Sequence, residues 1–248
     1  MKPSNDQELV CGINAVKEII SIRPRSVLKL LLQDEKQNSR IESLSSLAKK
    51  NHIEIILEDD NFFERNFIEQ NHQGVAILCN KRVEENETFL EKLLEKENLL
   101  ILILDHLTDP HNVGACLRSA AAAGADAVIV PKNRSCHLTP TVRKISSGGS
   151  ELMPFIVVTN LNRTIERLSD SGVKVIGAAA DTGKNHTEID MKGSAAFIIG
   201  SEDKGLKRLT AEKCDTLAAI DMPGGIESLN ASVTAGIILF EYVRQNNH

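Results

Sequence analysis

The feature that most restricts the fold is an alternation of short apolar runs with helical stretches, which starts at residue 99. The first run, LLILILD at 99–105, is apolar at almost every position, as expected for a strand buried on both faces. Strands that alternate with helices favour a mostly parallel sheet covered by helices on both sides. The predicted strands are 99–105, 126–130, 155–158, 173–178, 195–199 and 216–221, and the predicted helices are 110–123, 140–146, 161–170, 206–213 and 229–245.

A smaller α/β unit is predicted ahead of this alternation. Its expected helices are 14–21, 39–50 and 60–67, and its expected strands are 26–32, 53–57 and 74–79. The stretch NKRVEENETFLEKLLEKEN at 80–98 is rich in Glu and Lys and has one apolar row, which is typical of a linker with a short amphipathic helix. We therefore expect domains at 1–80 and 99–248, joined by a linker at 81–98.

The composition argues against several classes of protein. The net charge is −5, and with no Trp and one Tyr the chain has little from which to build a stacking surface for single-stranded nucleic acid. The apolar run at 99–104 is too short to cross a bilayer, and MKPSNDQELV has no apolar leader. The five cysteines are scattered without a C-x-x-C spacing, and the histidines have no metal-ligand spacing. We expect a cytoplasmic protein without disulfides or metal.

Two stretches are locally basic although the chain is acidic overall. SIRPRSVLK at 21–29 and PKNRSCHLTPTVRKISSGGS at 131–150 contain no acidic residue. Such charges are often simply solvated surface, but loops of this kind also contact phosphates. The candidate phosphate contacts are Arg23, Arg25, Arg134 and Arg143.

Three loops at predicted strand ends carry unusual residues, and ligands of parallel sheets bind at such ends. The first is DPHNVGACLRSA, where Asp109 can cap a helix and Pro110 can begin it. The second is FIIGSEDKGL, and the third is IDMPGGIESLN. The second lacks the Lys of a phosphate-binding loop, no G-x-G-x-x-G occurs, and Ser228 lacks a G-x-S-x-G elbow. Each loop taken singly could still be a structural turn or cap.

Taken together, the three loops resemble the three motifs of the SpoU family of RNA ribose 2′-O-methyltransferases. VCGINAVKEII and HQGV resemble the two ends of the small L30e-like RNA-binding domain that many members carry, so the resemblance covers nearly the whole chain. It implies a Rossmann-like parallel sheet of the SPOUT class, whose C-terminal segment forms a trefoil knot. It also implies a homodimer that methylates RNA with S-adenosylmethionine. The likeness is strongest to members that methylate a guanosine of large-subunit (23S) ribosomal RNA.

The resemblance assigns roles to residues of the three motifs. It implies catalytic roles for Asn112, Arg118, Glu202, Ser228 and Asn230, and cofactor contacts for Gly200, Gly205, Ile220, Met222 and Leu229. An arginine fork beside a phosphate and a hydroxyl favours developing negative charge on oxygen. Because guanidinium stays protonated, we interpret Arg118 as a clamp, and leave Glu202 as either its partner or the proton acceptor.

Some alternatives stay open at this level. A non-catalytic RNA-binding protein would keep the small unit and the basic loops, but it would not need Asn112, Arg118 and Glu202 together. A transfer-RNA ribose methyltransferase of the same family is the other alternative; the extra N-terminal domain favours ribosomal RNA, although some transfer-RNA enzymes of the family also carry extensions. The third motif also departs from the family pattern, because Asp221 stands where a proline is usual. Finally, Asn112 and Arg118 lie six residues apart, so on one helix they do not share a face.

Overall fold

The computed structural model describes residues 3–34, 38–68, 70–180, 184–201 and 205–246. The chain divides into two compact units, Met1–Val83 and Glu84–His248. The boundary lies within the stretch predicted to be a linker. No helix in the described ranges is long and apolar enough to span a membrane.

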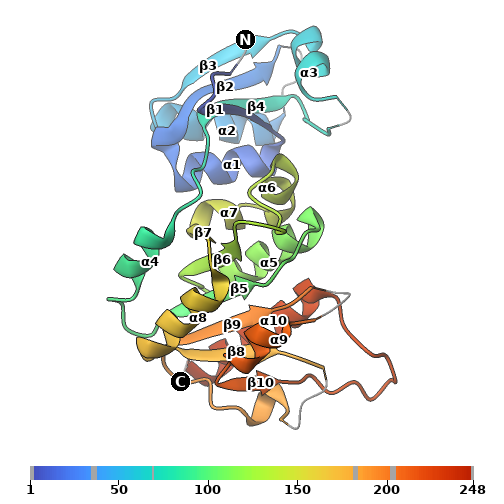
Figure 1. Ribbon diagram of the computed structural model, residues 1–248. Coiled ribbons are helices and arrows are strands. Elements are labelled where there is room, and N and C mark those ends of the chain that lie inside the picture. The colour runs from blue at the N-terminus through green and yellow to red at the C-terminus, as the bar shows by residue number, and fades with distance from the viewer. Residues whose placement is uncertain (1–2, 35–37, 69, 181–183, 202–204, 247–248) are drawn as a thin grey trace. The chain divides into compact units, whose positions relative to one another are not determined.

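The first unit is a four-stranded mixed sheet with three α-helices (Figure 1). The strand order is β1-β4-β2-β3, in which β4 is antiparallel to both neighbours and β2 is parallel to β3. Buried residues of α1 and α2 pack on one face of the sheet, and three phenylalanines of α3 and the residue after it pack on the other. The elements are β1 (Gln7–Cys11), α1 (Ile13–Ile22), β2 (Val27–Gln33), α2 (Ser39–Lys50), β3 (Glu54–Glu58), α3 (Asp60–Asn66) and β4 (Val75–Asn80).

The sequence did not predict β1, which is an edge strand. All five of its residues are only half-buried, and it is held by antiparallel pairing of Gln7–Cys11 with β4. That pairing joins segments about 70 residues apart, so the hydrophobic pattern within either segment does not predict it.

The second unit contains a six-stranded sheet of order β10-β8-β9-β5-β6-β7, in which every neighbouring pair is parallel. This confirms the predicted parallel α/β class. The strands are β5 (Leu100–Leu104), β6 (Ala127–Pro131), β7 (Phe155–Val158), β8 (Lys174–Ala178), β9 (Ala195–Ile199) and β10 (Thr216–Ala218). The helices are α4 (Glu87–Leu93), α5 (Pro110–Ala122), α6 (Pro140–Ser146), α7 (Gly149–Leu152), α8 (Leu161–Asp170), α9 (Arg208–Glu212) and α10 (Ala231–Asn246).

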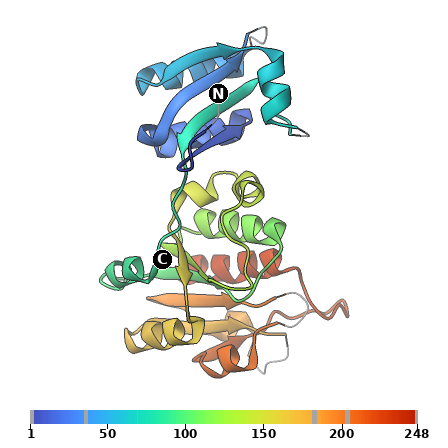
Figure 2. The same cartoon turned by 45° about the horizontal axis from the view of Figure 1, so that its top comes forward.

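Alternate residues of the central strand β5 belong to two separate hydrophobic cores. Leu100, Leu102 and Leu104 face α5 and α10, whereas Ile101 and Ile103 face α4 and α8. Figure 2 shows the sheet nearly edge-on, with α5 and α10 on one side and α8 and α9 on the other. Burial on both faces explains why these strands are apolar at nearly every position.

Small residues let the helices of this unit approach closely. A Cβ on Gly114 of α5 would lie 2.7 Å from Ile145 Cβ of α6, and a Cβ on Gly149 of α7 would lie 2.7 Å from the Leu117 carbonyl oxygen. Helix α7 itself was not predicted, because its four residues are shaped by this tertiary contact and not by a helical repeat. The predicted elements 206–213, 216–221 and 229–245 are shorter at their N- or C-terminal ends in the structure.

The residues just after the unit boundary are built into the second unit. Leu90 of α4 is 1% exposed and belongs to one of its cores. Glu85 forms an isolated parallel bridge with Ile156 of β7, and the Glu84 carboxylate accepts a hydrogen bond from the backbone nitrogen of Leu138. The second unit therefore starts well ahead of its first central strand.

Candidate functional site: a cavity at the carboxyl ends of the strands

A cavity of about 750 Å³ opens beyond the carboxyl ends of β8, β9 and β10. This is the edge at which parallel sheets bind their ligands. All five residues predicted to contact a cofactor line it, together with Ser228 from the catalytic set. The lining is Ala178, Ala179, Ala180, Ile199, Gly200, Ser201, Gly205, Leu206, Ala211, Ala218, Ile220, Met222, Glu227, Ser228, Leu229, Ala231 and Thr234.

One wall of the cavity is the tight turn that follows β9. The backbone nitrogens of Ser201 and Gly205 donate to each other's carbonyl oxygens at 3.1 and 2.8 Å, so the two arms of the turn lie side by side. A Cβ on Gly200 would lie 2.2 Å from the carbonyl carbon of Gly205, and Gly205 has a φ of +61°. Both positions therefore require glycine. Glu202, a predicted catalytic residue, lies outside the described residues.

The opposite wall is the segment between β10 and α10. Ile220, Met222, Ser228 and Leu229 line the cavity, whereas Asp221, the departure from the family pattern, is exposed and does not belong to the lining. The backbone nitrogen of Gly225 donates to the Met222 carbonyl oxygen at 3.2 Å, which closes the turn of the Pro-Gly-Gly segment.

The floor of the cavity consists of small side chains that the sequence did not single out. Ala178 ends β8 and is followed by Ala179 and Ala180, and Ala218 ends β10. The available signal was the run of three alanines at a strand end. Small side chains and glycines leave backbone groups accessible, and the volume lies in the range of small-molecule sites. The cavity therefore fits a ligand of the size and mixed polarity of S-adenosylmethionine.

Two of the predicted catalytic amides meet across the helix pair α5 and α10. The Asn230 Nδ2 donates to Asn112 Oδ1 at 2.8 Å, and Asn112 is 7% exposed. Asn230 Oδ1 accepts from the backbone nitrogen of Ser232 at 2.9 Å, so the same side chain caps the start of α10. The Asn230 side chain is therefore held by Asn112 and by the start of α10. Asn230 lies between Leu229 and Ala231, which both line the cavity.

Arg118 lies on the exposed face of α5. Within the described residues its guanidinium has no hydrogen-bond or ion-pair partner. An ion pair that braces the fold through Arg118 is therefore not seen in that part of the chain. The structure does not bring Arg118 into contact with the cavity lining.

The four arginines predicted to contact phosphates fall into two groups. Arg25 and Arg134 are exposed. Arg23 donates to the Asn80 carbonyl oxygen at 2.7 Å and lies 3.6 Å from Glu8, with only 14% of its side chain exposed. Arg143 lies 3.9 Å from Glu151, with 10% of its side chain exposed. Arg23 and Arg143 are committed to internal partners, which leaves Arg25 and Arg134 as the accessible pair.

His137 anchors the basic loop between β6 and α6. His137 Nδ1 lies 2.9 Å from Glu84 Oε2, and Nε2 lies 3.0 Å from the Lys132 carbonyl oxygen. Both neighbours are acceptors, so an imidazolium that donates from both nitrogens satisfies the geometry. The hydrogen bond to Glu84 raises the pKa of His137. The described residues contain no cluster of three or more metal-ligating side chains.

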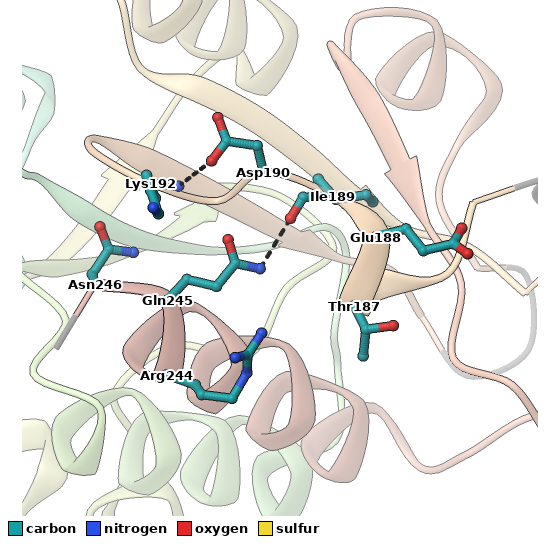
Figure 3. A pocket seen from close by; sticks show the side chains of 8 residues that line it. All are labelled: Thr187, Glu188, Ile189, Asp190, Lys192, Arg244, Gln245 and Asn246. Carbon is teal, nitrogen blue, oxygen red and sulfur yellow. Dashed lines mark hydrogen bonds between the residues drawn. The ribbon is translucent and has the colours of Figure 1, made fainter. Parts of the chain in front are cut away.

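A second hollow of about 630 Å³ lies beside the C-terminal end of α10 and contains none of the predicted site residues (Figure 3). Gln245 Nε2 donates to the Ile189 carbonyl oxygen at 3.0 Å, and Asn246 Nδ2 donates to the Met191 carbonyl oxygen at 3.1 Å. The backbone nitrogens of Met191 and Gly193 donate back to the same two side chains. These amides hold the 189–193 segment against α10, so we assign the hollow a structural role.

Comparison with known proteins identifies the class. The chain belongs to the SpoU rRNA methylase family, whose model matches residues 99–240, and residues 9–83 match the model described as RNA 2′-O ribose methyltransferase substrate binding. Among curated relatives, the 23S rRNA (guanosine-2′-O-)-methyltransferase RlmB of Pseudomonas putida is 42% identical over 240 residues, covering 96% of each chain. RlmB of Coxiella burnetii is 44% identical over 239 residues, covering 95% of each chain.

Solved structures have the same fold. The SpoU methyltransferase AviRb from Streptomyces viridochromogenes, in complex with the cofactor AdoMet, superimposes with a TM-score of 0.78 at 22% identity, covering 97% of this chain and 90% of that chain. The TrmH/SpoU tRNA modifying enzyme of A. aeolicus covers 64% of this chain and 83% of that chain, with a TM-score of 0.55 at 25% identity.

Proposed function

We propose that this protein transfers a methyl group from S-adenosylmethionine to the ribose 2′-hydroxyl of a guanosine in 23S ribosomal RNA. The observation that carries the proposal is the cavity itself: Gly200, Gly205, Ile220, Met222 and Leu229 come from two separate motifs and line one space. The relatives at 42% and 44% identity over almost the full length support the same reaction and the same substrate.

S-adenosylmethionine supplies an electrophilic methyl group on a sulfonium when it is bound. The glycine turn and the alanine floor provide accessible backbone groups and small side chains that leave space for such a ligand. Methyl transfer requires the hydroxyl oxygen to approach in line with the methyl group, so the main task of the protein is to fix both partners.

We assign the binding of the target nucleotide to polar side chains of the first and third motifs. We assign its orientation to the amide pair Asn112 and Asn230 and to Ser228. The fork of Arg118 suits a phosphate and stabilises negative charge that develops on the hydroxyl oxygen. Its exposure and its lack of a partner among the described residues leave the guanidinium available to RNA. Glu202 is our candidate for the proton acceptor or for the group that orients Arg118.

We assign RNA binding to the first unit and to the basic loop of the second. The match of residues 9–83 to a substrate-binding model supports the first assignment. The exposed Arg25 and Arg134 are the phosphate contacts that we retain from the predicted four. This division assigns residues 1–80 to substrate binding and 99–248, with the preceding segment from Glu84, to methyl transfer.

We further propose that the enzyme is a cytoplasmic homodimer with the trefoil knot of its family and no bound metal. Helix α10 supports the dimer, because Val233 and Phe240 are 47% and 49% exposed and lie two turns apart on one face. An exposed apolar row of this kind is typical of a surface that a partner covers.

The decisive experiment maps ribose methylation in RNA from cells with and without this protein. We expect one guanosine of 23S ribosomal RNA to lose its 2′-O-methyl group, and purified protein with S-adenosylmethionine to restore it. Loss of a methyl group from transfer RNA instead would establish the alternative substrate. RNA with an unchanged methylation pattern, together with no transfer in vitro, would reject the reaction.

A further inference from the structure

Three polar side chains behind the cavity form a connected chain of hydrogen bonds. Asp105 follows β5 directly and is 1% exposed. Its carboxylate contacts Nδ1 of His106, and Nε2 of His106 lies 2.6 Å from the Lys207 ammonium. Asp105 and His106 are adjacent, but Lys207 lies 101 residues from His106 in the sequence.

The chemistry of the three groups fixes the position of each proton. An ammonium group is only a donor, so His106 Nε2 must accept from Lys207. The remaining ring proton is then on Nδ1, where it donates to the Asp105 carboxylate. A buried carboxylate needs such donors, and the backbone nitrogen of Lys207 gives a second one to Asp105 Oδ2 at 3.4 Å.

This order of donors and acceptors excludes a role for His106 as a general base. An Asp-His pair acts as a base through the nitrogen that faces away from the carboxylate. Here that nitrogen, Nε2, is already bound by Lys207. His106 is therefore a positioning residue.

The three residues hold both ends of the turn that forms one cavity wall. The backbone nitrogen of Asp105 donates at 2.8 Å to the carbonyl oxygen of Ile199, the last residue before Gly200. At the other end of the turn, Lys207 directly follows Leu206, which lines the cavity and packs against β8 at Gly177. Asp105 thus contacts Ile199 and Lys207, on either side of the turn. His106 contacts both the Asp105 carboxylate and the Lys207 ammonium, so it links these two side chains.

The backbone of His106 has a conformation that is unfavourable for a residue with a side chain. Its φ is +61°, in the left-handed region that glycine adopts without cost and other residues adopt rarely. A side chain kept in such a conformation suggests a function that offsets the strain.

We propose that Asp105, His106 and Lys207 are positioning residues that shape the cofactor cavity by fixing two described segments of its wall, Ile199–Ser201 and Gly205–Lys207. This inference rests on the proposed function, in which the cavity binds S-adenosylmethionine. It assigns the three residues to cofactor affinity and not to the methyl-transfer step.

The test uses His106→Gly and Lys207→Met in the full-length protein, with the double variant. The dissociation constant for S-adenosylmethionine is measured by calorimetry, alongside KM, kcat and Tm. We expect both single variants to raise the dissociation constant and KM about tenfold and to leave kcat at saturating cofactor within about twofold. The dissociation constant of the double variant should not exceed that of the single variant that binds the cofactor more weakly, because the two side chains act as one unit.

Stability separates this role from a merely structural one. His106→Gly relieves the left-handed backbone but removes one donor to the buried Asp105 carboxylate, so the two effects on Tm should largely cancel while cofactor affinity falls. Asn98→Gly is the matched backbone control, since Asn98 has a φ of +53° and is exposed at another point of the same unit. Lys192→Met is the matched lysine control, because Lys192 lines the other hollow. Both controls should bind the cofactor normally.

Two results would overturn the inference. One is a wild-type dissociation constant in both variants, and the other is a loss of affinity in His106→Gly that is matched by a loss of Tm. A wild-type protein that binds no S-adenosylmethionine would overturn the proposed function as well. Wild-type binding with unaffected variants would overturn this inference alone.

Discussion

Asn230 donates a hydrogen bond from its side-chain nitrogen to the Asn112 oxygen across 118 residues of sequence, at 2.8 Å. The same Asn230 side chain accepts from the start of α10, so one residue both caps a helix and fixes a buried amide of another. This relationship joins the first and third motifs, which the sequence could only place at the ends of two predicted strands.

Exchanges of Asn230 separate its two tasks. Asn230→Ser keeps a capping oxygen but is too short to hold Asn112, so we expect a nearly unchanged Tm and a loss of methyl transfer of about 10- to 100-fold. Asn230→Ala should show the same loss and cost about 1 kcal/mol of stability as well. Thermal melts and single-turnover assays measure both effects.

The control for this exchange is Asn160, which caps α8 away from the cavity through the backbone nitrogen of Arg163 at 3.1 Å. Asn160→Ala should lose a similar amount of stability and keep its activity per folded molecule. Full activity in Asn230→Ser would show that Asn230 is only a cap.

The turn after β9 should not tolerate a side chain at its first residue. A Cβ at Gly200 would overlap Gly205, so Gly200→Ala must open the turn; we expect a loss of about 1–3 kcal/mol of stability and no measurable cofactor binding by calorimetry. Gly224→Ala is the control, because a Cβ there meets nothing within 4 Å. Normal binding by Gly200→Ala would contradict the cavity assignment.

The two groups of basic residues should respond differently in RNA binding. Replacing Arg25 and Arg134 by Ala should weaken binding and reduce the slope of log affinity against log salt by roughly 0.7 to 0.9 for each phosphate that is no longer neutralised. Replacing Arg23 and Arg143, which have internal acidic partners, should lower Tm and leave the slope unchanged. Filter binding at several salt concentrations distinguishes the two pairs, and equal slopes in both would refute the grouping.

The stability of the second unit should depend on pH through His137. Because the pKa of His137 is raised in the folded state, its contribution is fully present below the unfolded value of about 6.5 and is lost as pH rises through the higher folded value. His137→Gln should therefore lower Tm at mildly acidic pH and have a smaller effect at pH values above the folded pKa. A titration of the His137 ring by NMR gives that folded value, and a pKa at or below the ordinary one would contradict the charged geometry.

How much the sequence predicted depends on whether a feature is local. The helices at 140–146 and 161–170 and the strands at 155–158 and 195–199 match the structure at both ends, because each combines an apolar pattern with a strong cap or a buried run. Edge strand β1 and helix α7 depend on partners distant in sequence and were missed.

The site follows the same rule. Six residues of the cavity lining were predicted, from motifs whose residues keep a fixed local spacing. The alanine floor, the internal partners of Arg23 and Arg143, and the link between His106 and Lys207 required the folded chain. A basic residue in a loop looks identical in sequence whether its charge faces solvent or an acid.

Arg118 provides the sharpest test of the catalytic assignment, because the structure gives it exposure on α5 and no partner among the described residues. Loss of an exposed side chain should change stability by less than about 0.5 kcal/mol, so Arg118→Ala should keep its Tm and its affinity for S-adenosylmethionine. If the guanidinium clamps the target ribose and phosphate, methyl transfer should fall by on the order of 10² or more, as for other single donors to a transition state. Arg118→Lys should recover little, since an ammonium group lacks the planar fork. Near-normal turnover in Arg118→Ala would show that the arginine is an ordinary surface residue, and a large drop in Tm would show that it stabilises the fold. In either case another residue would have to bind the phosphate.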